Sequence, residues 1–143
     1  MATFELFYQL TQDVLRGVHD FDNDTFKCAL SNTAPGPTDA VFGDITEIAS
    51  GSGYTANGQA LANVATSRTD GVTKVSADDE VFTASGTMAS FRYAVVYNDT
   101  PTSPADPLLC YYDYGSAISL ADSETFTVDF DDSNGIFDLQ EAA

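Results

Sequence analysis

The residue types that most often carry catalysis are scarce in this chain of 143 residues. It has a single histidine, His19, and two cysteines, Cys28 and Cys110. His19 stands in a polar turn before the sequence FDND, and nothing in the sequence brings a serine or cysteine nucleophile to it. We therefore expect a solvated or capping histidine, no catalytic residue, and a protein that is not an enzyme.

Both cysteines lie in apolar segments, FKCAL and LLCYY. Such surroundings are typical of a buried free thiol that packs as a small hydrophobic group. A disulfide between the two is the alternative, which synthesis in the cytoplasm disfavours. Neither cysteine belongs to a CxxC motif, so the sequence predicts no metal site built on sulfur.

Two aspartate-rich runs, 20–24 and 130–141, have the oxygen donors that Ca²⁺ prefers. The first has Thr25 where an EF-hand loop needs glycine, and the second has Phe130 at the first ligand position. We interpret both runs as turns capped by aspartate side chains and predict no cofactor, with a surface Ca²⁺ site as the alternative. Paired aspartates for hydrolase chemistry would arise here only by chance on an acidic surface.

The tyrosines of two apolar segments could instead form a platform on which sugars stack. Their alternation within expected strands is more typical of core packing, and the chain has no tryptophan. The tyrosines concerned are Tyr93, Tyr97, Tyr111, Tyr112 and Tyr114.

Charge excludes several partners. Five Lys and Arg stand against 22 Asp and Glu, which gives a net charge of −17. A chain without a basic stripe cannot neutralise phosphates, so we expect no nucleic acid and no anionic membrane as a partner. With 43% hydrophobic residues the chain should nevertheless fold, as a single domain over residues 1–143. We see neither a signal peptide nor an apolar run of about 18 residues, and expect synthesis in the cytoplasm.

The elements that would position these residues are mostly strands. Apolar residues at three- and four-residue steps predict one helix over about 4–17, which Gly17 ends: Leu6, Phe7, Leu10, Val14 and Val18 face one side, and Gln9, Gln12, Asp13 and Arg16 the other. Residues 25–31 alternate, which predicts a half-buried strand. Proline-containing loops follow at 33–58 and 100–107.

From residue 59 onward the pattern is β. We expect turns at Asp70-Gly71 and Asp78-Asp79, and a tight hairpin at Asn134-Gly135. Segments 89–98 and 108–115 should be covered on both faces, while 123–130 should direct Phe126, Val128 and Phe130 inward. Short strands at even spacing predict an antiparallel β-sandwich, jelly-roll-like, with one N-terminal α-helix.

The order of five segments resembles the small virion structural proteins of tailed bacteriophages. The likeness spans residues 24–139, and the glycine-tyrosine turn and the strand RYAVVYND are its most recognisable parts. The segments are DTFKCALSN, DAVFGDITEIASGSGYTANGQAL, ASFRYAVVYND, PLLCYYDYGS and SETFTVDFDDSNGIFDL.

This resemblance implies a capsid decoration, or cement, protein that binds the outside of the head and braces neighbouring capsomers. Its partner would be the lattice of the major capsid protein, with self-association as a further option, and it would lie on the capsid exterior. The N-terminal helix with either long loop would supply the attachment surface. The alternative that the resemblance leaves open is a tail, baseplate or fibre component with a receptor- or glycan-binding role.

Overall fold

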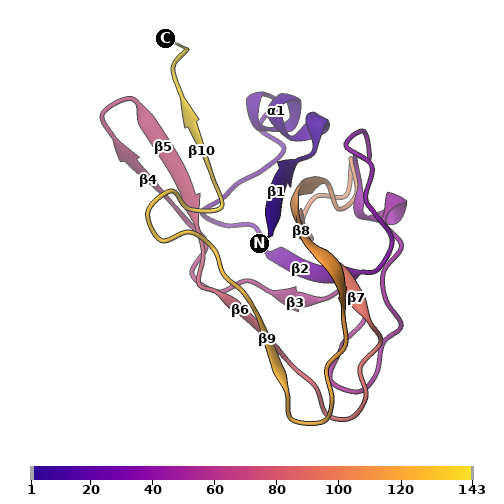
Figure 1. Ribbon diagram of the computed structural model, residues 1–143. Helices are drawn as coiled ribbons and strands as arrows, with labels where there is room; N and C mark the ends of the chain where they lie inside the picture. Colours follow the sequence, from indigo (N-terminus) through magenta and orange to yellow (C-terminus); the bar gives the residue numbers. More distant parts are fainter. Residues whose placement is uncertain (1, 143) are drawn as a thin grey trace.

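The structure is a computed structural model that describes residues 2–142. This part of the chain is mainly β, with antiparallel sheets and one short α-helix near its beginning (Figure 1). The predicted fold class is therefore confirmed. The described helices include none that is long and apolar enough to cross a membrane.

The described strands form three antiparallel sheets. The largest has the order β1 (Thr3–Leu6), β8 (Leu108–Ile118), β7 (Phe91–Asn98), β2 (Phe26–Ser31) and β3 (Gln59–Ala60). A second sheet contains β10 (Phe137–Gln140), β5 (Val72–Ser76) and β4 (Ala65–Thr69), and a third pairs β6 (Glu80–Thr83) with β9 (Thr125–Val128). The arrangement is sandwich-like, although its sheets have five, three and two strands instead of the two four-stranded sheets of a regular jelly roll.

The main core combines buried side chains of the five-stranded sheet, such as Leu30 and Cys110, with Phe82 of β6 and Val128 of β9 in one cluster. A smaller cluster covers the opposite face of the large sheet. There Phe42, in the 3₁₀ turn η1 (Phe42–Asp44), stacks on Tyr97 with ring centroids 4.1 Å apart. The loop over 33–58 thus shields that face.

Burial on both faces changes the interpretation of β2. The prediction of a half-buried strand over 25–31 is wrong, because Ala29 and Ser31 are as buried as Phe26 and Cys28. The strand pairs with β7 on one side and β3 on the other, so it lies inside the sheet. The prediction that β7 is covered on both faces is confirmed, whereas β8 is buried at its start and exposed towards its end.

The predicted helix over 4–17 is wrong in its first part. Residues Thr3–Leu6 form β1, which pairs with β8, and the helix α1 spans only Tyr8–Leu15. Phe4 and Leu6 point to one face and Glu5 to the other, so this segment also has the period of two that a strand needs. Phe7 follows as a fully buried anchor, and its burial contributes about 1.5–3 kcal/mol.

The predicted end of the helix is confirmed. Gly17 has a φ of +71° and its N–H donates to the carbonyl of Val14, while the N–H of Val18 donates to the carbonyl of Asp13. This pair of bonds is the Schellman motif, which satisfies the last carbonyls of a helix. The prediction for Asp13 is wrong. This residue was expected on the polar side of the helix, but it is only 2% exposed.

Of two predicted hairpin turns, one is confirmed and the other is wrong. Asp70 and Gly71 join β4 to β5 in a two-residue hairpin, as predicted. Asn134-Gly135 does not close a hairpin between β9 and β10, because β9 pairs with β6 and β10 pairs with β5. The turn redirects the chain from one sheet to the other.

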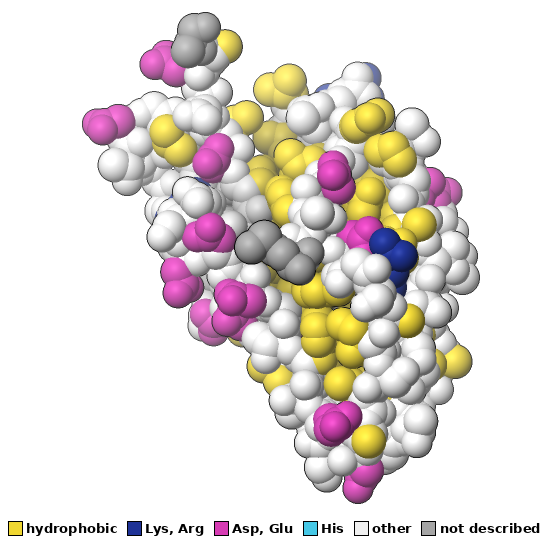
Figure 2. All heavy atoms as spheres, viewed as in Figure 1, with side chains coloured by type: hydrophobic (Ala, Val, Ile, Leu, Met, Phe, Trp, Pro, Cys, Tyr) yellow, Lys and Arg dark blue, Asp and Glu magenta, His cyan; other side chains and the backbone are white. Residues whose placement is uncertain are grey.

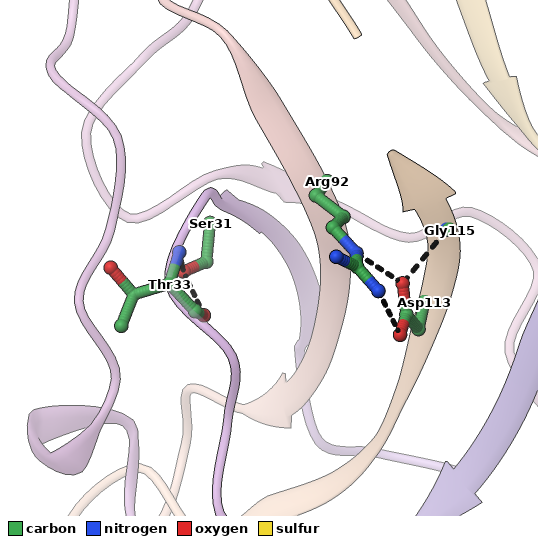
Figure 3. A network of polar contacts seen from close by, with 5 residues as sticks. All are labelled: Ser31, Thr33, Arg92, Asp113 and Gly115. Atoms are coloured by element: carbon green, nitrogen blue, oxygen red, sulfur yellow. Dashed lines mark hydrogen bonds and ion pairs between the residues drawn. The ribbon is translucent and has the colours of Figure 1, made fainter. Parts of the chain in front are cut away.

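A polar network links β7 to β8 in the large sheet, near the beginning of β7 (Figure 3). Arg92 donates from Nε and an Nη to the two carboxylate oxygens of Asp113 over 2.7 and 3.0 Å. The N–H of Gly115 donates to the same carboxylate, and these bonds hold the pKa of Asp113 below its usual value, with the Arg92 bonds as the larger cause. A bulge in β7 places Arg92 beside Asp113 and over the ring of Tyr93.

Candidate interaction surface

Large apolar side chains are exposed mainly at one end of the molecule. Four of the six that the described chain exposes lie on β1, α1 and β10: Phe4 at 39%, Tyr8 at 68%, Leu15 at 84% and Leu139 at 55%. Figure 2 shows hydrophobic side chains gathered along the furrow between the sheet of β4, β5 and β10 and the body of the molecule. Grouping of this kind marks an interaction surface more often than scattered single residues do.

A groove of about 410 Å³ runs beside β1. Its floor includes Phe4 and Leu6 of β1 and Tyr112 of β8, and its far wall is the segment 129–138. Phe4 lies directly across from Tyr112 in the sheet, with ring centroids 5.2 Å apart. We call this hollow the β1 groove.

A smaller apolar hollow of about 130 Å³ lies between α1 and β10, and we call it the helix groove. It is lined by Leu10, Val14 and Leu15 from α1 and by Leu139 from β10. Both grooves share Leu6, Phe137 and Asp138, so they form one continuous surface.

The rim of the β1 groove is acidic. Its described lining includes the exposed carboxylates Asp129, Asp131 and Asp138 and has no lysine or arginine. Hydrogen bonds from the backbone N–H groups of Asn134 and Ser133 hold the pKa of Asp131 below its usual value, so this group is charged at neutral pH. The surface therefore combines an apolar floor with negative charge.

The groove also borders a free sheet edge. β1 is the outermost strand of its sheet and pairs only with β8 in the described chain. The N–H of Phe7 donates to the carbonyl of Leu109 over 3.1 Å, and in the register of the two strands these residues are directly opposite. Hydrogen-bonded pairs alternate along an antiparallel ladder, so Glu5 also faces β8 while the backbone groups of Phe4 and Leu6 point outward.

Among the described residues, no backbone group outside the ladder bonds to Phe4 or Leu6. Their two N–H and two C=O groups are therefore available to a further strand.

His19 is not the solvated histidine that the sequence predicts, because only 9% of it is exposed. It packs beside the stacked rings of Phe21 and Phe26. The side-chain amide of Asn98 donates to Nδ1 of His19 over 3.1 Å and to the carboxylate of Asp24 over 2.7 Å. The partner that buries this histidine comes from β7, 79 residues away in sequence.

A second buried polar residue, Asp13 on α1, acts on His19 through its charge. Neither Nε2 of His19 nor Oδ2 of Asp13 has a hydrogen-bond partner among the described atoms. Burial lowers the pKa of His19, while the charges of Asp13 and Asp24 act in the opposite direction. The cluster joins α1 to the body of the fold, and it holds no nucleophile.

The aspartate-rich runs form capped turns, as predicted. Asp20 accepts from the N–H of Asp22 and the side chain of Asn23, and Asp131 accepts from the N–H groups of Ser133 and Asn134. Over residues 2–142 no group of three or more His, Cys, Asp or Glu side chains is placed to hold a metal ion.

The tyrosines and cysteines serve mainly in packing. Tyr93 and Tyr97 are buried at 6% and 1% exposure, so they offer no face to a sugar, while Tyr111, Tyr112 and Tyr114 are half-buried. Both cysteines are free and buried, and each lies across from Val96 on a neighbouring strand. The prediction of buried free thiols is confirmed.

The two long loops and the helix contact one another. The N–H of Tyr8, which begins α1, donates to the carbonyl of Pro37, and the N–H of Phe42 donates to the carbonyl of Asp106. The three elements named as an attachment surface thus adjoin, although most of the exposed large apolar side chains lie on β1, α1 and β10.

Sequence reasoning identified the helix but missed the edge strand and β10 as parts of one surface. The signal for the edge strand was the alternation of Thr3, Phe4, Glu5 and Leu6, which the helical pattern beginning at Leu6 obscured. A scan against protein-family models, a search of curated proteins and a search of solved structures each found no match to this chain.

Proposed function

We propose that this chain is a capsid decoration protein of a tailed bacteriophage, a non-enzymatic virion component that binds the outside of the head and stabilises it. The ordered set of segments over 24–139 carries this proposal. The partner is the lattice of the major capsid protein.

The continuous surface of β1, α1 and β10 supports this role. A decoration protein must be soluble alone and must also hold to many identical sites. An acidic molecule that gathers most of its exposed large apolar side chains on one surface meets both needs. Rigid strands beneath it keep Phe4, Leu6 and Leu139 in place, which lowers the entropic cost of binding.

The net charge of −17 also favours the outside of the shell. Packaged DNA is strongly negative, and an acidic protein facing it would be repelled. On the exterior, the same charge keeps the free protein soluble and attracts a basic shell.

The location of the chain in the parent particle tests the proposal. Heads and tails are separated and analysed by mass spectrometry, and cryo-electron microscopy of the heads is searched for density of this fold. We expect many copies per head, bound outside the shell. Density restricted to the tail overturns the proposal and favours the tail, baseplate or fibre alternative, and absence from the virion overturns both.

A binding experiment tests the surface. Heads stripped of the chain are incubated with the purified protein carrying Leu15→Ser and Leu139→Ser, and occupancy is measured by quantitative gel analysis. We expect a loss of at least about tenfold in apparent affinity, since two buried apolar contacts are removed. Val81→Ser is the matched control, because Val81 is 45% exposed on β6, outside both grooves. Equal loss in both variants contradicts the assignment of the surface.

A further inference from the structure

We propose that the free edge of β1 binds an extended, basic segment of a partner protein as an additional antiparallel strand. The inference names the partner chemistry of the surface described above and in that respect rests on the proposed function. It is tested on the isolated chain with synthetic peptides, so its outcome does not depend on where the chain lies in a virion.

The backbone provides the first part of the argument. Phe4 and Leu6 direct two N–H and two C=O groups away from β8, and no described backbone group bonds to them. An antiparallel strand uses such groups in pairs, so two of its residues would each form two hydrogen bonds with β1. Free edges are the sites at which extended peptides add to sheets.

The groove specifies which side chains the new strand carries. Residues directly opposite one another in an antiparallel pair project to the same face. The two residues opposite Phe4 and Leu6 would therefore enter the β1 groove, where they meet Tyr112 and Phe137. Apolar side chains fit these two positions.

Charge specifies the remaining positions. The residue between the two apolar ones projects to the other face beside Glu5, which is exposed. The residues two positions outside the apolar pair project to the same face as Phe4 and Leu6, where the exposed carboxylates of Asp129 and Asp138 line the groove. Lysine or arginine at these positions complements the acidic rim, whereas a second copy of this chain would bring a net charge of −17 to it.

The experiment uses a seven-residue peptide in which two valines are separated and flanked by lysines. Binding is followed by two-dimensional NMR on the isotope-labelled full chain. We expect saturable shifts at β1 and slowed hydrogen exchange of the Phe4 and Leu6 amides. A peptide with glutamate in place of lysine should bind at least about tenfold more weakly. Absence of saturable binding by the lysine peptide at millimolar concentration overturns the proposal.

Backbone methylation separates strand addition from non-specific adhesion. The N–H groups of the two valines face β1, and that of the central lysine faces away. Methylation of the valine nitrogens should abolish binding, and methylation of the central lysine nitrogen should leave it within about twofold. Equal effects of the two peptides overturn the proposal, because an apolar or electrostatic contact alone would not distinguish them.

Charge variants of the chain test the rim. The double variant Asp129→Asn with Asp138→Asn should lower the affinity for the lysine peptide by roughly threefold for each carboxylate and reduce the salt dependence of binding. Asp70→Asn with Asp122→Asn keeps the same net charge and changes residues outside the β1 groove, so it is the control. Equal weakening by both pairs overturns the assignment. The two proposals fail separately. A tail location of the chain would overturn the proposed function and leave strand binding intact. Absence of binding by the lysine peptide would overturn strand binding and leave the proposed function intact.

Discussion

The side-chain amide of Asn98 donates to Nδ1 of His19, which leaves the histidine proton on Nε2. The orientation of the amide is fixed because its oxygen accepts from the N–H of Thr100 over 3.1 Å and its nitrogen also donates to Asp24. Protonation of Nδ1 would place two donors against each other inside the fold. The neutral imidazole is therefore part of the packed structure.

Stability should fall when His19 becomes protonated. Burial lowers its pKa from the ordinary value of 6.5, and the charges of Asp13 and Asp24 only partly oppose this. Between the lowered pKa of the folded chain and the ordinary pKa of 6.5, the unfolded chain therefore binds more protons than the folded one. The contribution to stability is present above pH 6.5 and is lost as the pH falls from there through the folded pKa. The contribution of His19 to the pH dependence of the free energy of unfolding cannot exceed about 1.4 kcal/mol per pH unit, because one proton is involved.

Urea unfolding between pH 7.5 and 5 measures this slope, in parallel with the variant His19→Gln. Glutamine retains hydrogen bonding and does not titrate, so its curve should be flatter over the same interval. An unchanged slope in His19→Gln would assign the pH dependence to carboxylates instead.

Two glycines with positive φ should differ in how far alanine destabilises the fold. At Gly17 an added Cβ meets no atom within 4 Å, so Gly17→Ala should cost only the left-handed backbone term of about 1–2 kcal/mol. At Gly58 the added Cβ would overlap the carbonyl oxygen of Cys28 on β2. Overpacking adds about 1–3 kcal/mol, so Gly58→Ala should cost between about 2 and 5 kcal/mol. Chemical unfolding of both variants decides, and equal losses would contradict the packing of Gly58 against β2.

Much of the fold could be predicted from local patterns. Apolar residues on both faces identified β7, and the apolar flanks of Cys28 and Cys110 identified buried thiols. The N-terminal segment failed because Phe4 and Leu6 satisfy a strand period while Leu6, Phe7 and Leu10 satisfy a helical one. Pairing with β8, more than 100 residues away, decides between them.

The candidate surface was harder to predict than the fold. His19 looked solvated because its neighbours in sequence are polar, and its burial depends on Asn98 and on aromatic rings brought in by folding. Likewise β1 and β10 come from opposite ends of the chain, so no local pattern joins Phe4 to Phe137. An isolated sequence carries too little information about such long-range contacts.

The cysteines should react only when the chain unfolds. Burial raises the pKa of both Cys28 and Cys110 and removes them from solvent, so neither thiolate is available. We expect no labelling by a thiol-specific chromogenic reagent in the native state and two equivalents in urea. Cys28→Ser should remove one equivalent in urea. Rapid labelling of the native protein would contradict the packing of the sheet around Val96.

Amide hydrogen exchange should alternate along β1. The N–H of Phe7 is bonded to Leu109, and the register assigns the N–H of Glu5 to β8 as well, whereas those of Phe4 and Leu6 face outward. We expect Glu5 and Phe7 to exchange measurably more slowly than Phe4 and Leu6 in NMR exchange experiments at neutral pH, because exchange requires breaking the ladder bond. The N–H of Tyr8, bonded to Pro37, is an internal reference for a protected amide next to the strand. Uniformly fast exchange would mean that β1 detaches from β8 in solution, and uniformly slow exchange would mean that its outer edge is already occupied.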